Sequence, residues 1–356
     1  MLKDSSPTDY FVHMPLPGSP GYWGVATNWD GQWYSYIATE GYLPSSVDST
    51  WHTGWAWAFP PGYPKSVSVV MQATGWSFPV SAVTVSLILG AIAMILMYRI
   101  AEPHVGWIGA AGLVAIACCF ASAPLLQVAY SESLALCLVL WSLTHLSKQQ
   151  YWWALVPLLL LSFTRLITPP LGFVVIFHVW IRVRYRREKI NGRESVALFV
   201  YVVCSLVGVA VWSWVASSLG GGVGASRAGS MVSNYSGGWF GAAYAHSTLG
   251  GISLGVLALT FLVGVLRQWR SWGPELSAWA AGYPLFILLV TPPTTGLVRY
   301  LLLAFPLGLA FVGSDGQVPW RRTVRVGLVC GVFFGIQVLW VRYSFVAPAA
   351  GLGLMP

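Results

Sequence analysis

The chain has 356 residues, of which 56% are hydrophobic and only 8% are charged, and its mean hydropathy is +0.67. Soluble domains carry about 25% charged residues, so this composition excludes an ordinary soluble protein and predicts an integral membrane protein. The net charge of +8 does not indicate nucleic-acid binding. The basic residues stand at the ends of apolar runs, where such residues set the orientation of a membrane protein.

Residues 1–77 are rich in Pro, Gly, Trp and Tyr and contain no apolar run long enough to span a bilayer. No signal peptide begins this segment. If Asn28 caps a short helix, Trp29, Trp33 and Ile37 lie on one face, and Asp30 and Tyr34 share the neighbouring face. We expect such a helix to lie along the membrane surface with its rings at headgroup level, which would hold Asp30 near the interface.

The rest of the chain, residues 78–345, consists of apolar runs separated by short polar connections. The predicted membrane segments are 78–98, 105–123, 132–147, 153–164, 171–183, 195–217, 249–266, 277–290, 299–313 and 324–345. They predict an all-α polytopic bundle with about ten membrane segments, followed by an extracytoplasmic tail at 346–356. The segments 153–164 and 171–183 are short and flank Pro169 and Pro170, so they form either two spans or one re-entrant hairpin.

The distribution of bases predicts the orientation. Placing residues 1–77 outside leaves 6 of the 19 Lys and Arg residues on the outer side, namely Lys3, Lys65, Arg165, Arg227, Arg299 and Arg342, and 13 on the inner side. The positive-inside rule favours this arrangement. A polar segment outside the membrane needs something ahead of it to start translocation. We therefore hypothesise that a transmembrane helix that should precede residues 1–77 is missing from this chain.

Extracytoplasmic acid/base chemistry would have to use one of six carboxylates, which are Asp4, Asp9, Asp30, Glu40, Asp48 and Glu132. Asp30 has the most aromatic surroundings, and such rings either stack on sugars or anchor the chain at the membrane interface. Glu132 starts a membrane segment, where an acid is costly and is usually paired or functional. Alternatively, Glu132 matches the dipole of the helix that it begins.

Arg165 and Arg299 are the outer bases that adjoin membrane segments. Two guanidiniums suit a lipid-linked phosphate or diphosphate, although each could equally snorkel to ordinary headgroups. Lys65 is a weaker candidate for the same role. The Gly-rich stretch 218–249 is expected to be a loop that acts either as a lid or as a connector. No disulfide, metal site or cofactor is expected from the five cysteines and six histidines.

Five short motifs together resemble the PIG-V-type mannosyltransferases, which add the second mannose in GPI-anchor synthesis and have bacterial relatives. The motifs are Trp29-Asp30-Gly31-Gln32-Trp33-Tyr34, Phe59-Pro60-Pro61-Gly62-Tyr63-Pro64, Tyr130-Ser131-Glu132-Ser133-Leu134, Thr164-Arg165 and Arg299-Tyr300 with Phe305-Pro306. Their order and spacing agree with the family over nearly the whole chain. Arg165 is followed by Leu166, where the family has Pro.

The resemblance implies a GT-C glycosyltransferase, which is a polytopic helical enzyme that uses a polyprenyl-phosphate sugar and carries an essential acid in its first extracytoplasmic loop. In this family a transmembrane helix precedes that loop. The lipid phosphate is a good leaving group, so one carboxylate that deprotonates the acceptor hydroxyl suffices. Asp30 would be this base, and Arg165 or Arg299 would neutralise the departing phosphate.

The sequence thus predicts inverting transfer of a sugar, mannose by the resemblance, to a lipid, glycan or protein acceptor outside a bacterial plasma membrane. Membrane lipids are expected partners and nucleic acids are not. Two alternatives remain: a transporter or flippase for a lipid-linked sugar, and an inactive scaffold subunit. Transporter folds commonly contain internal repeats, and we find none between the halves of the chain.

Overall fold

The computed structural model describes residues 21–42, 53–233, 237–291, 293–294, 296–313 and 319–345, and these residues form helices and connections without any β-strand. Asp4, Asp9, Asp48 and the expected tail 346–356 lie outside the described residues. The helices are α1 (Gly21–Ala26), α2 (Asp30–Thr39), η1 (Thr53–Ala58), α3 (Gly62–Thr74), α4 (Phe78–Cys119), η2 (Ala123–Gln127), α5 (Glu132–Ser147), α6 (Tyr151–Ser162), α7 (Pro169–Arg184), α8 (Gly192–Ser233), α9 (Gly238–His246), α10 (Thr248–Leu266), α11 (Trp269–Trp272), α12 (Pro274–Val290), α13 (Leu297–Tyr300), η3 (Leu301–Gly308), α14 (Leu309–Val312), α15 (Pro319–Trp340) and η4 (Val341–Phe345).

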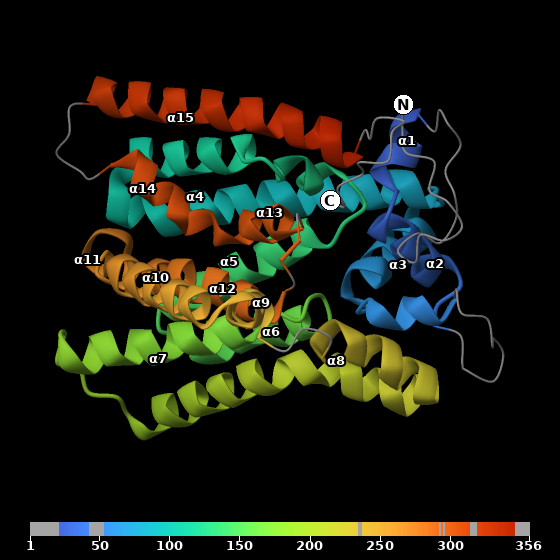
Figure 1. Ribbon diagram of the computed structural model, residues 1–356, viewed down its shortest axis with the longest axis horizontal. Helices are drawn as coiled ribbons and strands as arrows, with labels where there is room; N and C mark the ends of the chain where they lie inside the picture. Colours follow the sequence, from blue (N-terminus) through green and yellow to red (C-terminus); the bar gives the residue numbers. More distant parts are fainter. Residues whose placement is uncertain are drawn as a thin grey trace.

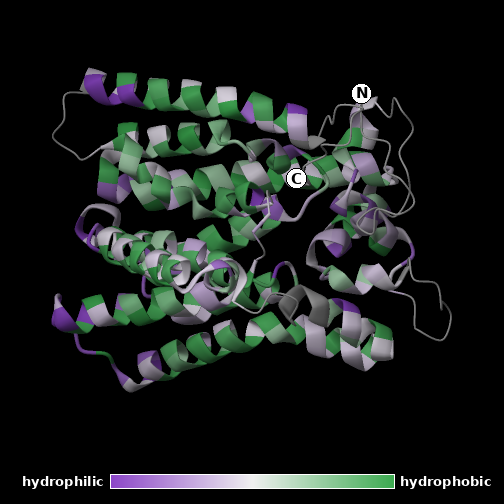
Figure 2. Ribbon diagram, viewed as in Figure 1, coloured by the Kyte–Doolittle hydropathy of each residue, from purple (hydrophilic) through white to green (hydrophobic). Residues whose placement is uncertain are grey.

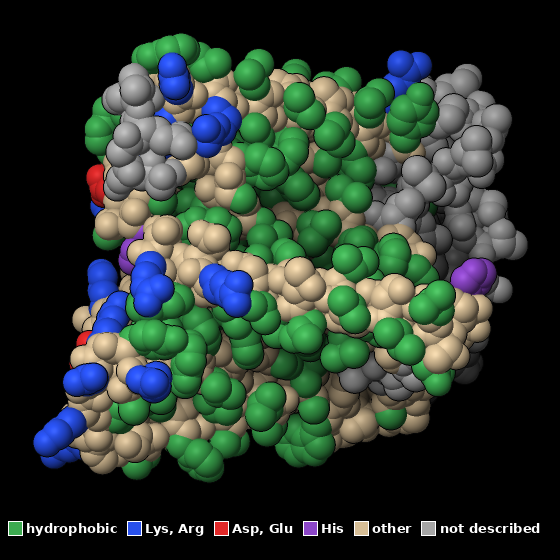
Figure 3. Space-filling view, turned by 60° about the vertical axis from the view of Figure 1, so that its left-hand side comes forward, with side chains coloured by type: hydrophobic (Ala, Val, Ile, Leu, Met, Phe, Trp, Pro, Cys, Tyr) green, Lys and Arg blue, Asp and Glu red, His purple; other side chains and the backbone are tan. Residues whose placement is uncertain are grey.

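The long helices lie side by side, so the molecule has two ends (Figure 1). One end holds the α7–α8 connection and α11, and we call it the basic end because Lys and Arg side chains gather there (Figure 3). The other end holds α2 and α3, and we call it the site end. Hydrophobic residues fill the middle of the long helices, and most hydrophilic residues lie toward the two ends (Figure 2). This is the distribution of a bundle that spans a bilayer.

Each of the ten predicted membrane segments coincides with a helix or helical run of the structure. The first two are the halves of α4, which turns at Gly106, where φ is +68°. Among the described residues, four helices are long and apolar enough to cross a membrane, namely Phe78–Cys119, Gly192–Ala228, Thr248–Leu266 and Trp320–Tyr343. Several others are apolar but shorter, including α5, α6 and α12. The prediction of an all-α membrane bundle is therefore confirmed.

The short helices α6 and α7 run antiparallel between the two ends of the molecule. The hydroxyl of Tyr151, the first residue of α6, accepts a hydrogen bond from Arg182 near the end of α7 at the basic end, at 2.6 Å. Just beyond the other end of α6, the carbonyl of Phe163 accepts a hydrogen bond from the backbone N–H of Gly62, at 2.6 Å. Because Gly62 begins α3, α6 connects the basic end to the site end, and α7 returns.

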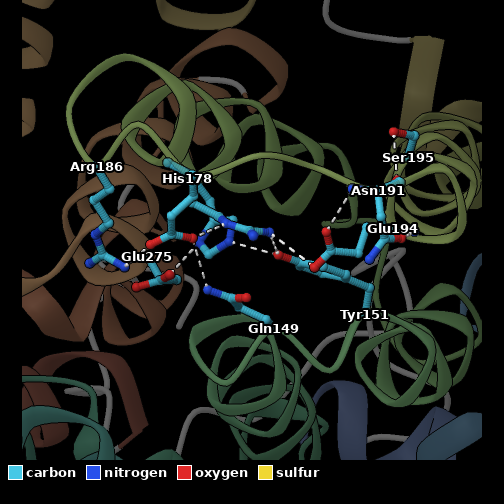
Figure 4. A network of polar contacts seen from close by, with 10 residues as sticks. Gln149, Tyr151, His178, Arg186, Asn191, Glu194, Ser195 and Glu275 are labelled. Atoms are coloured by element: carbon cyan, nitrogen blue, oxygen red, sulfur yellow. Dashed lines mark hydrogen bonds and ion pairs between the residues drawn. The ribbon is translucent and has the colours of Figure 1, made fainter.

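A buried polar network joins α6, α7 and α12 at the basic end (Figure 4). His178 Nδ1 lies 2.5 Å from Glu275 Oε1, and His178 Nε2 lies 3.1 Å from the Tyr151 hydroxyl. Arg182 extends the network from that hydroxyl to Glu188 in the α7–α8 connection, at 2.6 Å. Buried polar groups need such partners because an unpaired one is costly. The network therefore ties these helices together far from the site end.

The prediction of a Gly-rich loop at 218–249 was wrong, because the described residues of this stretch are mainly helical. The chain reverses at Gly221 (φ +57°), and the second part of α8 packs back on the first. The approach is close: a Cβ atom on Gly224 would lie 2.1 Å from the carbonyl oxygen of Ala216. The glycines thus permit backbone contact between two helical segments, where the sequence analysis had expected them to provide freedom of movement.

The expected surface helix after Asn28 exists as α2, but its rings are buried inside the protein. Trp33 is 1% exposed and Tyr34 is 4% exposed. Trp33 stacks on Phe59 and Tyr34 packs edge-on against Tyr63, with ring centroids 6.2 and 5.1 Å apart. The prediction that these rings meet lipid headgroups was therefore wrong, because η1, α3 and the residues between them cover Trp33 and Tyr34.

Candidate active site

Four ionisable side chains from four separate segments meet at the site end. They are Asp30 at the start of α2, Glu132 at the start of α5, Arg165 in the α6–α7 connection and Arg299 in α13. All four are candidate site residues from the sequence. Their formal charges cancel, which is how a largely buried group of ions is normally arranged. We call these four residues the charge cluster.

Glu132 joins the two arginines. Its side chain is fully buried, and its Oε1 atom is 2.6 Å from Arg165 Nη1 and also accepts a hydrogen bond from Arg299 Nε. As the first residue of α5, Glu132 also lies where the positive end of the helix dipole favours a carboxylate. Glu132 is thus paired, as expected for a buried acid, and it also stands at a helix start. Without Glu132, Arg299 would keep Asp30 as its partner and Arg165 would have no described acid beside it.

Asp30 is the most accessible of the four. Its Oδ2 atom is 2.5 Å from Arg299 Nη2, and its side chain is 23% exposed. Its Oδ1 atom makes no hydrogen bond or ion pair with any described residue. The preceding residue, Trp29, has φ +55°, an uncommon value for a bulky side chain. Strained backbone of this kind clusters at functional sites.

Each arginine also lies against a tyrosine ring. Arg165 is 5.4 Å from the ring centre of Tyr300, and Arg299 is 4.5 Å from that of Tyr130. Burial lowers the pKa of Arg165, but the Glu132 carboxylate more than offsets this effect, so the net pKa is raised and the guanidinium stays charged. Only Nη1 of Arg165 is paired; its Nε and Nη2 atoms make no hydrogen bond with a described residue. Arg165 therefore keeps donors for a further anion.

The backbone that carries Arg299 is held by side chains of neighbouring helices. This stretch is irregular, since α13 is short and Ala304 in η3 has non-helical angles. Three of its carbonyls accept hydrogen bonds from side chains: Val298 from Ser122 at 2.9 Å, Tyr300 from Tyr283 at 2.9 Å and Leu303 from Trp279 at 2.7 Å. Irregular backbone at membrane depth needs such partners. The three donors thus fix the position of Arg299.

Tyr34 connects α2 to the start of α5. Its hydroxyl donates a hydrogen bond to Ser131 Oγ at 3.1 Å, next to Glu132 in the chain. Burial, followed by the nearby Asp30 carboxylate, raises the pKa of Tyr34, so the phenol stays neutral. Trp33 is buried in the same hydrophobic cluster as Tyr34, and Trp29 is buried in the neighbouring core. These three buried aromatic residues therefore fix the start of α2, which carries Asp30.

Lys65 is not brought to the charge cluster. It is exposed on α3, whose buried residues Tyr63 and Val67 face the interior, and it forms no ion pair with a described residue. Four further contributors, Tyr130, Tyr300, Trp279 and Tyr283, were not predicted from the sequence. Tyr130 and Tyr300 stand inside the quoted motifs, beside or near the charged residues, which is the signal that could have revealed them.

An apolar cavity of about 190 Å³ lies close to Arg299 along the chain. Its lining comes from α4, η3, α14 and α15, and includes Leu301, Phe305, Phe120 and Phe333. Among the described residues, no group of three His, Cys, Asp or Glu side chains is placed to hold a metal ion.

The structure resembles that of ArnT from Cupriavidus metallidurans, which was solved with undecaprenyl phosphate bound. The TM-score is 0.51, the sequences are 14% identical, and the match covers 94% of this chain. The chain has a GT-C-type fold. It spans 62% of the length of ArnT. No family model and no curated protein matches the sequence, so the resemblance to PIG-V-type enzymes stays a prediction.

Proposed function

We propose that the protein is a membrane glycosyltransferase that moves a sugar from a polyprenyl-phosphate donor to an acceptor hydroxyl. One observation carries the proposal: an accessible carboxylate and two guanidiniums meet at the site end of a GT-C-type fold. A carboxylate can accept the proton of an attacking hydroxyl, and guanidiniums can hold a leaving phosphate. The ArnT structure, which contains undecaprenyl phosphate, supports a lipid phosphate as the donor group.

In the reaction, the acceptor oxygen attacks the anomeric carbon while the bond from that carbon to the phosphate oxygen breaks. The Asp30 carboxylate takes the proton of the acceptor, and polyprenyl phosphate departs with the electron pair. Arg165 and Arg299 neutralise the charge that develops on the phosphate. A single displacement inverts the anomeric carbon, so a β-linked donor sugar becomes an α-linked product. General-base assistance contributes about 10²- to 10⁴-fold to such a step.

The donor lipid can lie with its isoprenoid chain on apolar surface and its phosphate at the arginines. The apolar cavity supports this orientation, since Leu301 and Leu302 in its lining follow Arg299 along the chain by only two and three residues. We place the site on the extracytoplasmic side of a bacterial plasma membrane, because the bases gather at the opposite end of the bundle (Figure 3). We propose mannose as the sugar, from the motif resemblance, and a lipid, glycan or protein as the acceptor.

The proposal is tested with the purified full chain in lipid nanodiscs. Polyprenyl-phosphate mannose, and the corresponding glucose and aminoarabinose donors, are supplied with a mannosidic acceptor, and the product is examined by NMR. We expect a new α-linked glycoside from the mannose donor. If no donor yields a product, while the protein moves lipid-linked sugar across a vesicle membrane, the transport alternative replaces the proposal.

A further inference from the structure

The two acids of the charge cluster differ in how firmly they are held. Glu132 is fully buried, stands at a helix start and contacts both arginines. Asp30 is 23% exposed, contacts one arginine and belongs to the segment that precedes the first long helix. Glu132 is thus a fixed counter-ion, whereas Asp30 occupies a position at Arg299 that another anion could take.

We propose that the donor phosphate displaces Asp30 from Arg299, and that this exchange releases Asp30 to act as the base. The inference rests on the proposed function. Asp30 Oδ2 is 2.5 Å from Arg299 Nη2, so this oxygen is occupied by the guanidinium and does not face an acceptor hydroxyl. After the exchange, the phosphate is the partner of Arg299, and both Asp30 oxygens are available to the acceptor hydroxyl.

The charges favour an exchange over simple addition. The four formal charges of the cluster cancel, so it does not attract a further anion strongly. Arg165 offers Nε and Nη2, which have no hydrogen-bond partner among the described residues, and its side chain is 13% exposed. A phosphate that first meets Arg165 can then reach Arg299, because Glu132 holds the two guanidiniums against one carboxylate oxygen. Two arginines around one phosphate is a geometry that guanidinium groups favour.

The exchange also gives the reaction an order. As long as no donor is bound, Arg299 holds Asp30, and the base is suppressed. Donor binding activates it, so an acceptor hydroxyl is deprotonated only when a sugar is in place to receive it. This couples phosphate binding at the arginines to the availability of the Asp30 oxygens through a single shared side chain, Arg299.

The test measures binding and not activity. Undecaprenyl phosphate is titrated into the full chain in nanodiscs, with neutral undecaprenol as the reference lipid, for wild type, Asp30→Asn, Asp30→Glu and Glu40→Gln. Asp30→Asn removes the competing charge, so we expect it to bind the phosphate lipid on the order of tenfold more tightly than wild type. Asp30→Glu keeps the charge and should bind no more tightly than wild type.

Glu40→Gln is the matched control, because Glu40 directly follows the same helix, is exposed and has no ion-pair partner among the described residues. It should bind as wild type does. Equal or weaker binding by Asp30→Asn, with the folded state confirmed by gel filtration, would overturn the exchange and leave the donor site standing. If Asp30→Asn does not fold, the decisive variant is Asp30→Glu, which keeps the charge. Tighter binding of undecaprenyl phosphate by Asp30→Glu than by wild type then overturns the exchange. If no variant prefers the phosphate lipid to undecaprenol, both the exchange and the proposed function fail.

Discussion

Replacing Glu132 by Gln should destabilise the protein strongly, although the two side chains have nearly the same shape. Glu132 is fully buried and is the acid that Arg165 contacts, whereas Arg299 also has Asp30. The substitution therefore leaves the Arg165 guanidinium, which is 13% exposed, without an anionic partner. Breaking a buried ion pair by removing one partner costs about 3–5 kcal/mol. We expect a loss in this range in the free energy of unfolding.

The assay is an SDS titration of the detergent-solubilised protein followed by tryptophan fluorescence. Glu102→Gln is the control: Glu102 is exposed on α4 and accepts a hydrogen bond from the Tyr98 hydroxyl at 3.0 Å. Its change should stay within about 0.5 kcal/mol, as for most surface substitutions. A loss below about 1 kcal/mol for Glu132→Gln would refute the view that this acid holds the two arginines together.

Three further substitutions test the supports of the site. Tyr283→Phe leaves a backbone carbonyl of the α13–η3 stretch without its donor, so we expect the KM for the donor lipid to rise about tenfold, which corresponds to about 1.4 kcal/mol. Tyr244→Phe at an exposed position should leave the KM unchanged. An unchanged KM in both variants counts against the proposed support. Gly62→Ala places a Cβ atom 2.5 Å from Thr164 Oγ1, so it should displace the α6–α7 connection and lower the rate of sugar transfer. Gly327→Ala adds a Cβ atom with nothing within 4 Å and should keep the wild-type rate. Equal rates for the two variants would contradict this expectation. Glu275→Gln removes the charged partner of His178 in the basic-end network, so it should lower the midpoint of thermal unfolding. The rate of sugar transfer should stay within about twofold of wild type. A large loss of rate would show that the two ends of the molecule are coupled.

The sequence predicted the helices well because apolar runs and prolines mark helix limits clearly. It also selected the four members of the charge cluster, since acids and bases at the ends of membrane segments are rare and costly. It could not show that Glu132 Oε1 serves both Arg165 and Arg299, because these residues are brought together only by the packing of three separate segments.

Two predictions failed for a common physical reason. The aromatic face of α2 and the glycines of α8 were each interpreted from local properties, as an interfacial anchor and as a flexible loop. In the structure, both meet other parts of the chain: Trp33 stacks on Phe59, and Gly224 approaches Ala216. Burial by a distant segment is not encoded in a local pattern, since the same rings suit headgroups or a protein interior.

The rate of sugar transfer by Asp30→Asn tests the central claim most directly. The measurement follows transfer of labelled mannose from polyprenyl-phosphate mannose under saturating donor, for wild type, Asp30→Asn and Glu40→Gln. If Asp30 is the base, Asp30→Asn loses about 10²- to 10⁴-fold in kcat while it still binds undecaprenyl phosphate, and Glu40→Gln keeps the wild-type rate. Equal rates for wild type and Asp30→Asn would contradict the assignment of Asp30 as the catalytic base.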